Sequence, residues 1–406
     1  MLFICMNVIY LYEFICFQLF YILFLFKRIF YFFFKYFWII KILIEKVMAQ
    51  GSCTAMCPHQ EIKEREKKGR IHFLETVQGS NLKSPVADYA KCVKEYVRSA
   101  AGSKKTDPKL LRTPEALYKT TTYLLGSVLE TPNHSKSLVS KTSFISDRLR
   151  CVRQDIVIQQ LSWRYAVPIL ERIIRYHIAV FNLLMYERLN DYDPVLNNVL
   201  LDSYMGDWCE YYDAAQLENN HLYNRYEFIS YYILLNIQNS AIYYKEFIFK
   251  NYHSHCDIRE ELDIIRALFE CYHKKNYYRF FRLVKKLTFL QSCCLIKMYN
   301  IIRINFLKQL NVAYSNKSLK FPLDKLKEWM LFNSTDDTRI FLNACGFSVP
   351  STVLFLYFDK NIVVKDLSAV ELIELNSTLS SEMLFRENQL ESKFLVDTIN
   401  KNDGDV

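Results

Sequence analysis

Glycine and proline are scarce in this sequence: its 406 residues include eight glycines and nine prolines. Folds rich in sheets or loops need many turn residues, and Gly and Pro are the residues that most strongly interrupt a helix. Hydrophobic residues make up 51% of the chain, which is enough to bury a sizeable core. The composition therefore favours long helices, arranged in one large domain or in two to three small ones.

Motifs for phosphate binding and for common hydrolytic chemistry are missing. No glycine stands two residues from another, which excludes the dinucleotide-binding pattern GxGxxG, and no Walker-type loop, HExxH or GxSxG is present. No ordered catalytic triad is evident, although triad members can lie far apart in a sequence. We therefore predict a non-enzymatic binding protein without a cofactor. A buried polar pocket with perturbed carboxylates would favour the alternative, an enzyme without a recognisable motif.

The twelve cysteines include no CxxC pair, a pattern typical of reduced, mostly buried thiols. Two groups contain residue types that bind zinc, but neither has four well-spaced ligands, so we predict no metal. The second group flanks a predicted helix whose ends lie about 22 Å apart at 1.5 Å per residue, too far for one ion. The two groups are Cys53, Cys57, His59 and His72, and His253, His255, Cys256, Cys271 and His273.

Residues 1–47 differ in composition from the rest of the chain. They contain eleven Phe but no Ala, Gly, Pro, Ser, Thr or Asp. One interpretation is a membrane anchor, although Lys27 and Arg28 divide the apolar run and no small-residue cleavage site follows. The other is an apolar leader translated from AT-rich non-coding DNA, with the protein beginning at Met48. We favour the second, because membrane-spanning helices use Gly and Ala freely, and we then expect no membrane partner.

Basic residues are unevenly distributed along the chain. The whole sequence has 52 Lys and Arg against 43 Asp and Glu, a formal net charge of +9. The segment from Lys274 to Met330 holds thirteen Lys and Arg but only two acidic residues, Asp324 and Glu328, which gives it a net charge of +11. A local excess of positive charge on a nearly neutral remainder predicts a site for a polyanion or an acidic partner.

Composition and periodicity divide the chain from residue 48 onward into four parts. Residues 48–82 are polar and charged, which predicts an extended arm with one short helix. Residues 83–315 hold successive amphipathic segments with short connections, which predicts an all-α domain of stacked helices. Residues 316–370 form a module of different character, and 371–406 are an acidic tail.

Proline and apolar spacing mark the helices expected in the all-α domain. Ser84-Pro85 is expected to open a helix that reaches Ala101, and Thr113-Pro114 to open the next one, which ends before Pro132. A polar loop is expected at 133–143. Further helices are predicted at 144–161, 166–189, 195–217, 222–237, 257–272, 276–289 and 291–310.

Two of these helices have clear core faces at helical spacing. In the second of them, Glu171 and Arg175 are expected to pair at i,i+4, and His177 is expected to be a packed core histidine. The expected core residues are Ile145, Leu149, Val152 and Ile156 on the first helix, and Ile169, Ile173, Val180 and Leu184 on the second.

Residues 316–370 combine two helical patterns with two strand patterns. LDKLKEWMLF is a predicted helix, and the next helix begins with a capping box of Ser334 and Asp337 and ends at Gly346. STVLFLYF and IVVKD are predicted strands, joined by a hairpin turn at Asp359-Lys360-Asn361. Two short helices followed by a β-hairpin predict a winged helix at the end of the all-α stack.

Two groups of basic residues are the candidate binding contacts. One follows a helical spacing that places it opposite an apolar face, and the other stands at the entry to the predicted winged helix. They form either a solvated helical face or a surface that contacts phosphates, where Tyr277 and Tyr278 are available to stack on unpaired bases. The candidates are Arg279, Arg282, Lys285 and Lys286, and Lys317, Lys320, Lys325 and Lys327.

Five ordered sequence blocks resemble those of the family of the germinal-centre-associated nuclear protein (GANP) and the leucine permease transcriptional regulator. The blocks are GSCTAMCPHQE at 51–61, VKEYVRSAAG at 93–102, LRTPEALYKTTTYLL at 111–125, FISDRLRCVRQDIVIQQ at 144–160 and ERIIRYHI at 171–178. His59 stands where the family often has a charged residue. The motif residues expected to be structural are Cys53, Met56, Cys57, Pro58, Arg148, Arg150, Arg153 and Asp155.

The resemblance implies a PCI-type architecture, in which TPR-like stacked helices are capped by a winged helix. It further implies a scaffold in nuclear mRNA export or transcription-coupled RNA handling. The implied partners are a small acidic subunit of the proteasome-lid type, a second PCI protein and RNA, and the implied location is the nucleus, including the nuclear pore. The chain also resembles a short animal member linked to centrosome duplication, so a centrosome and spindle factor that contacts only proteins is the alternative.

Overall fold

The computed structural model describes residues 50–81, 85–98, 107–131, 138–185, 193–218, 224–239, 259–368, 371–372 and 375. The sequence interpretations of residues 1–47, of His253, His255 and Cys256, and of the acidic tail beyond residue 375 lie outside these residues. Across the part of the chain that is described, no helix is both long and apolar enough to cross a membrane.

The chain is mostly helical, as its composition predicts. The first half contains α2 (His59–Lys67), α3 (Pro114–Tyr123), α4 (Leu138–Gln159), α5 (Trp163–Met185) and α6 (Pro194–Leu217). One 3₁₀ turn, η1 (Phe73–Glu75), lies in the arm, and a second, η2 (Pro108–Leu110), precedes α3. A π-helical turn, η3 (Leu124–Val128), extends α3.

The second half continues with shorter helices and ends in a small two-stranded sheet. Its elements are α7 (Arg225–Leu235), α9 (Arg259–His273), α10 (Tyr277–Val284), α11 (Phe289–Cys294), α12 (Ile296–Ala313), β1 (Phe321–Pro322), α13 (Leu323–Met330), α14 (Thr335–Ala344) and β2 (Phe355–Leu356).

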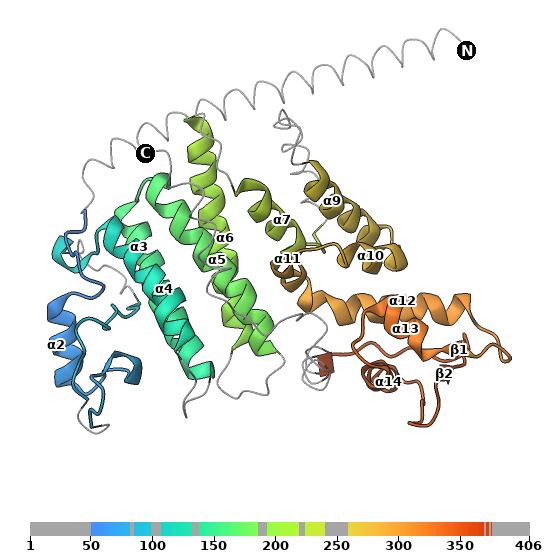
Figure 1. The fold of residues 1–406 in the computed structure, drawn as a ribbon. Helices are drawn as coiled ribbons and strands as arrows, with labels where there is room; N and C mark the ends of the chain where they lie inside the picture. The colour runs from blue at the N-terminus through green and yellow to red at the C-terminus, as the bar shows by residue number, and fades with distance from the viewer. Residues whose placement is uncertain are drawn as a thin grey trace, which may run out of the picture.

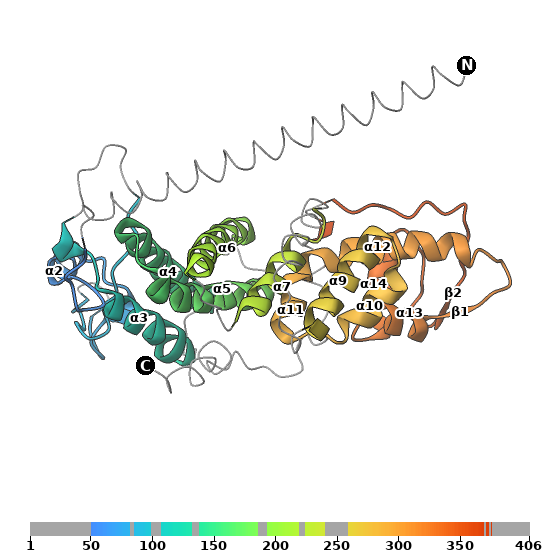
Figure 2. The ribbon, with the colours of Figure 1, turned by 90° about the horizontal axis from the view of Figure 1, so that it is seen from above.

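These elements form an elongated row. Both views place α2 at one end, α3 to α6 next, α7 and α9 to α11 in the middle, and the strands at the other end (Figures 1 and 2). α12 runs across the direction of α5 and α6, with α13 and α14 beside it (Figure 1). Many helices pack on helices close to them in sequence, α5 on α6 most extensively, whereas α11 packs mainly on α5 and α7. This is the side-by-side arrangement expected of successive amphipathic helices with short connections.

The predicted core faces are confirmed. The four apolar residues expected on the core face of α4 and the four expected on that of α5 are all buried. α5 sits between α3, α4, α6 and α11, so most of its surface is covered. Thr113 caps α3 through its side-chain oxygen, which accepts a hydrogen bond from the Ala116 N–H, and Pro114 occupies the first turn, as expected.

The helix predicted from Ser84-Pro85 to Ala101 is wrong over the described residues 85–98, which run without helix. Their backbone N–H groups bind other elements instead. The Val93 N–H donates to the Glu75 carboxylate, that of Lys94 to the Met56 carbonyl, and that of Glu95 to the Glu61 carboxylate. These N–H groups already have hydrogen-bond acceptors in distant parts of the chain. A helix would therefore give them no additional hydrogen bonds. The loop expected at 133–143 is shorter than predicted, since α4 begins at Leu138.

The ion pair predicted between Glu171 and Arg175 within α5 is also wrong, because each side chain binds a partner on another part of the chain. Arg175 binds Glu227 of α7 through two nitrogens, each 2.6 Å from a carboxylate oxygen. Glu171 accepts hydrogen bonds from the Trp208 indole and the Asn224 amide. Both side chains are buried, so contacts between helices decide their partners rather than spacing along one helix.

At the C-terminal end, β1 pairs antiparallel with β2, with Phe321 opposite Leu356. The hairpin predicted between STVLFLYF and IVVKD is therefore wrong, since residues 362–366 form no strand. The turn itself is present, with the Ile362 N–H bound to the Asp359 carbonyl. The Asn311 side chain of α12 donates to the carbonyls of Asp359 and Ile362, which holds the turn against α12.

The capping predictions for α14 are confirmed. Ser334 and Asp337 form a reciprocal capping box at its N-terminus. At its C-terminus Gly346 has a φ of 94°, a conformation that favours glycine. The N–H groups of Gly346 and Phe347 bind the carbonyls of Asn343 and Leu342, the pattern of a Schellman motif.

Candidate functional sites: a buried ionic network and a cationic surface

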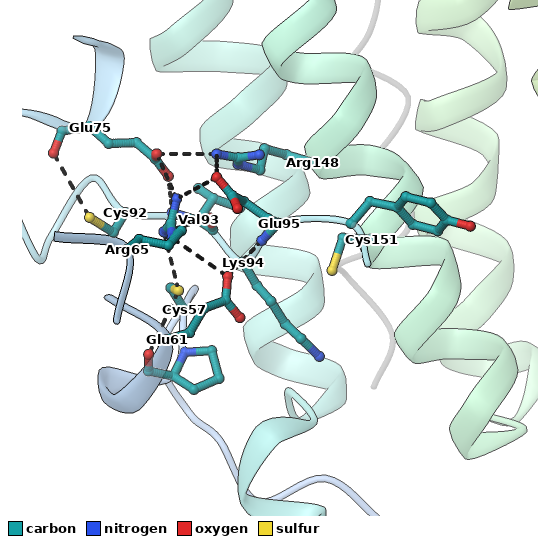
Figure 3. A network of polar contacts seen from close by, with 12 residues as sticks. Cys57, Glu61, Arg65, Glu75, Cys92, Val93, Lys94, Glu95, Arg148 and Cys151 are labelled. Atoms are coloured by element: carbon teal, nitrogen blue, oxygen red, sulfur yellow. Dashed lines mark hydrogen bonds and ion pairs between the residues drawn. The ribbon is translucent and has the colours of Figure 1, made fainter. Parts of the chain in front are cut away.

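A network of buried ion pairs attaches the arm to α4 (Figure 3). The Glu75 carboxylate, which has no exposed surface, lies 2.8 Å from an Arg65 nitrogen and 3.2 Å from an Arg148 nitrogen. Glu95 bridges the same two guanidinium groups at 3.3 and 3.2 Å. Two arginines and two glutamates from α2, η1, the extended segment 85–98 and α4 therefore form one connected cluster.

A second buried cluster lies further along α4. The Asp155 carboxylate accepts from the Arg112 guanidinium and from the Lys94 ammonium, both at 2.8 Å. One turn later, the Gln159 side chain accepts from the Gly51 N–H at 2.8 Å and donates to the Arg112 carbonyl at 3.0 Å. These hydrogen bonds join the start of the arm and the segment before α3 to the same helix.

Burial and charge act in opposite directions on the pKa values of these arginines. Burial by itself lowers the pKa of Arg65, but its neighbours, Glu75 first and then Glu95, together more than offset that effect, so the pKa lies above its ordinary value. The pKa values of Arg112 and Arg148 are raised in the same way: burial lowers each of them, but the charge and hydrogen bond of Asp155 outweigh it at Arg112, and Glu75, Asp147 and Glu95 together outweigh it at Arg148. The guanidinium groups therefore stay charged, and they donate hydrogen bonds without giving up a proton.

The thiols beside the network are not activated. Burial is the main cause of the raised pKa of Cys57, and it raises the pKa values of Cys92 and Cys151 to about 12. A thiol that stays protonated is a poor nucleophile and a poor metal ligand. The neighbouring guanidiniums use two of them as hydrogen-bond acceptors: Arg65 donates to Cys57 and Arg112 to Cys151. The network therefore has a structural role in this chain.

The family-motif residues fall at or beside this network. Cys53 pairs with Arg112 as an isolated β-bridge, the Met56 carbonyl accepts from Lys94, and Pro58 precedes α2 as its N-cap. The Arg150 guanidinium stacks 3.8 Å from the centre of the Tyr96 ring. Arg153 instead reaches α6, where two of its nitrogens bind the Asp207 carboxylate.

The described members of the two Cys/His groups, for which we predicted no metal, have other partners. Cys57 bonds within its own cluster, and the His72 ring accepts from the Leu74 N–H and stacks on Phe144. His273 lies against the Ile237 carbonyl. Among the described residues, no group of three or more His, Cys, Asp or Glu side chains could hold a metal ion.

His177 is fully buried between α5 and α6, as the sequence predicts. Its Nδ1 lies 2.8 Å from the Asn197 side-chain oxygen, so Nδ1 carries the proton. Burial lowers the pKa of His177 to about 4, and the Asn197 hydrogen bond offsets part of that effect. The ring is therefore neutral in the native chain at neutral pH.

The first group of candidate cations lies on α10 and in the turn after it. Arg279, Arg282, Lys285 and Lys286 are exposed, whereas Phe280 and Phe281 are buried on the opposite face. The α10 N-terminus is capped by the Asn276 side chain, which accepts from the Arg279 N–H. Within the described residues, none of these four cations has a carboxylate at ion-pair distance, and only Arg279 has a charge effect on a nearby carboxylate, that of Glu270, whose pKa is lowered mainly by its hydrogen bond with Lys274.

The second group divides between α13 and the α12–β1 connection. Lys325 is exposed and pairs with Glu328 at 3.3 Å, and Lys327 is half-buried and lies 3.8 Å from Asp324. Lys317 and Lys320 are exposed in the α12–β1 connection, where the Lys320 ammonium lies 4.9 Å from the centre of the Phe355 ring. The second group is thus partly neutralised by its own helix.

Packing brings α10 and α13 together. Tyr278 of α10 and Trp329 of α13 meet edge to face, with ring centres 5.2 Å apart. Arg282 lies one turn from Tyr278, and Lys325 lies one turn from Trp329, so both cations flank this aromatic pair. We call Arg279, Arg282, Lys285, Lys286 and Lys325 the cationic surface. Tyr278 is 43% exposed within it and offers an aromatic edge between the charges.

Sequence reasoning missed the main residues of the buried network. Arg65 lies in the polar string EIKEREKKGR, which predicts a solvated helix, yet its side chain is only 1% exposed. Glu75 likewise has no signal in the sequence. Arg148 and Asp155 stand in the family motif, and Lys94 and Arg112 lie in the resembling blocks at 93–102 and 111–125, but nothing in the sequence indicates which partners these charges have.

Comparison with known proteins gives the chain its relatives. The profile of the SAC3/GANP family matches residues 56–351. SAC3 family protein B of Arabidopsis thaliana is 27% identical over 334 residues, which is 78% of this chain and 19% of that protein. SAC3 family protein 1 of Schizosaccharomyces pombe is 27% identical over 326 residues, 75% of this chain and 31% of that protein.

Protein xmas of Drosophila melanogaster is 24% identical over 310 residues, 74% of this chain and 15% of that protein. The chain therefore spans less than a third of the length of these curated relatives. The family profile runs from Met56 in the arm to Ser351 beyond α14, so it includes both the buried network and the cationic surface. A match over most of the chain leaves one conclusion: this chain belongs to the SAC3/GANP family.

Proposed function

We propose that the chain is a non-enzymatic scaffold in nuclear mRNA export or transcription-coupled RNA handling, and that its cationic surface binds RNA. Membership of the SAC3/GANP family, whose members are of the scaffold type, supports the export theme. We further propose that α12, β1, α13, α14 and β2 form a winged helix that caps a PCI-type stack. The order of these elements and the antiparallel pairing of β1 with β2 support this assignment.

One observation carries the RNA proposal: where α10 packs on α13, the cations of α10 and Lys325 of α13, about 40 residues apart in sequence, flank the same aromatic pair. Charges spread over a surface act together on a phosphate backbone, whose negative charges are closely spaced. Such interactions position a nucleic acid without reading its sequence. The exposed part of Tyr278 supplies a ring on which an unpaired base can stack.

Protein partners are proposed for the same end of the molecule. We propose that the winged helix docks a small acidic subunit of the proteasome-lid type and a second PCI protein. An acidic subunit complements the cations of α10 by charge, and a protein partner beside the cationic surface would extend the area open to RNA.

The test measures binding of a fluorescent 20-nucleotide oligouridine RNA to the full chain between 50 and 200 mM salt. The variant carries Lys285→Glu, Lys286→Glu and Lys325→Glu in the cationic surface, and Lys320→Glu in the α12–β1 connection. We expect its Kd to rise roughly tenfold or more, because a complex in which fewer phosphates are neutralised releases fewer counterions from the RNA. The slope of log Kd against log salt should flatten by about 0.7 for each phosphate that is no longer neutralised.

The matched control reverses four exposed cations at the other end of the row: Lys63, Lys67, Lys68 and Arg70, each changed to Glu. It changes the net charge by the same amount. Equal loss of binding in both variants would show that net charge alone attracts the RNA, and unchanged binding in the first variant would refute the site. Because all eight side chains are exposed, we expect the unfolding midpoints to stay close to that of the parent chain.

The cellular role has its own test. A tagged full-length chain should concentrate in the nucleus and at the nuclear rim, where an export scaffold works. Concentration at spindle poles, with no RNA cross-linked to the protein, would favour the centrosome and spindle role instead.

A further inference from the structure

We propose that the outer face of α6 is a docking site for a basic amphipathic helix of a partner protein. This goes beyond RNA binding, and it concerns a different helix, outside the cationic surface. The outer face consists of Val195, Val199, Asp202, Gly206, Glu210 and Leu217, all of them exposed.

The spacing of these residues places them along one side of a straight 24-residue helix. The other side of α6 is fixed to the stack: Tyr204, Trp208 and Tyr212 are buried. Asp207 holds α6 to α4 through its ion pair with Arg153. Figure 2 shows α6 beside α5, to one side of the row that α4, α5 and α7 form. The outer face is therefore a long helical surface with no described element packed on it.

The charge of the outer face is of one sign. α6 contains four acidic residues and no Lys or Arg. Within the described residues, neither Asp202 nor Glu210 has a cation at ion-pair distance, whereas Asp207 is already paired. A phosphate backbone is repelled by such a face, which excludes RNA as its occupant. A helix with Lys and Arg on one side complements it.

Apolar residues stand at both ends of the same face. Val195 and Val199 are 68% and 55% exposed near the N-terminus, and Leu217 is 63% exposed at the C-terminus. Val199 and Leu217 are 18 positions apart, about 27 Å along the axis at 1.5 Å per residue. The partner helix should therefore have about 20 residues, with apolar side chains near its ends and cations between them.

Gly206 stands at the centre of the face. Glycine weakens a helix interior, and here it has no packing role in the chain, since a Cβ at this position would meet nothing within 4 Å. Its φ is not in the positive region that requires glycine. A missing side chain lets a second backbone approach closely, as at other helix crossings with a small residue at the interface. The geometry points to Gly206 as the crossing point.

The probe is a synthetic helix of about 24 residues with Leu near both ends and Lys along the same side between them. A matched peptide has Glu in place of each Lys. Binding to the full chain is measured by fluorescence anisotropy at 150 mM salt. We expect binding of the Lys peptide only, and a loss of at least tenfold with Asp202→Lys and Glu210→Lys combined. A control variant reverses two exposed acids elsewhere, Asp263→Lys and Glu328→Lys, and should bind as the parent does.

Gly206→Leu separates docking from simple attraction of opposite charges. Leucine favours a helix and has open space in the free chain, so the unfolding midpoint should stay equal or rise, whereas peptide binding should fall at least tenfold. Full binding by Gly206→Leu, or no binding by the parent chain, would overturn the proposal. So would sedimentation data showing that the parent chain self-associates through α6 and that Gly206→Leu abolishes this, because the occupant would then be a second copy.

Discussion

At the scale of single residues, the structure explains why certain identities are required. Gly51 lies in the GSC block, and a Cβ there would stand 2.6 Å from the Leu111 carbonyl oxygen and 2.7 Å from that of Arg112. Both obstacles are backbone atoms, so no side chain can move aside. The Gly51 N–H donates to Gln159, which ties the start of the arm to the end of α4. Glycine is thus needed for close approach and not for turn geometry.

We expect Gly51→Ala to lower the free energy of unfolding by about 1–3 kcal/mol, the usual cost of overpacking. Urea unfolding followed by circular dichroism measures it. Gly126→Ala is the control, since a Cβ at Gly126 meets nothing within 4 Å. Equal stability of the Gly51→Ala variant and the parent would mean that the arm is not held as closely as described.

His177 makes stability depend on pH. Its pKa is about 4 in the folded chain and about 6.5 in the unfolded one, so the unfolded chain binds more protons between these values. Stability from this residue is therefore complete above pH 6.5 and is lost as the pH falls towards 4. Between pH 7 and 5 we expect a loss of about 2 kcal/mol from this residue.

Urea unfolding at a series of pH values, with His177→Gln as the comparison, isolates this contribution. The variant should lack that part of the decline, although the substitution lowers stability at every pH. Parallel stability curves for variant and parent between pH 7 and 5 would count against a buried neutral histidine.

At the scale of elements, α4 connects the arm to the helical stack. One side of α4 packs on α3 and α5. Its charged residues bind outward: Arg148 and Asp155 bind the arm and the segment before α3, and Arg153 binds α6. Buried ion pairs of this kind add little net stability, but removal of one partner is costly because the other charge remains buried. The order of the arm therefore depends on α4.

Asp155→Ala should lower the free energy of unfolding by about 3–5 kcal/mol, because it leaves the buried Arg112 guanidinium unpaired. The arm should also become open to limited proteolysis, with cleavage between residues 59 and 92. Asp263→Ala, which breaks an exposed pair with Arg266, is the control and should cost less than about 1 kcal/mol. Equal effects of the two substitutions would show that the Asp155 cluster is solvated.

At the scale of the whole molecule, the two candidate sites lie at opposite ends of the row (Figure 1). The buried network joins the arm, α2 and α4, and the cationic surface lies on α10 and α13. Helices that contact only their neighbours in such a row transmit little strain from one end to the other. We therefore expect the two ends to act independently, as suits a scaffold that presents separate surfaces to separate partners.

Combining Asp155→Ala with the four charge reversals of the RNA-binding variant tests this independence. Unfolding free energies and RNA affinities should add to within about 0.5 kcal/mol of the sum of the separate effects. RNA affinity should not respond to Asp155→Ala at a temperature where that variant is still folded. A coupling larger than about 1 kcal/mol would contradict the separation of the two ends.

Local patterns in the sequence determined much of this protein: the all-α class, the stripes of α4 and α5, the capping of α3 and α14, and the exposure of the α10 cations. Each of these follows from residues within one or two turns of each other, so spacing and capping chemistry suffice. The tertiary structure decided the rest. In the tertiary structure, the backbone amides of residues 85–98 bind distant acceptors and form no helix. Arg175 binds Glu227, and β2 pairs with β1. The tertiary structure also buries Arg65 with Glu75 and joins α10 to α13. These outcomes depend on partners far away in the chain, which neither periodicity nor local propensity can identify.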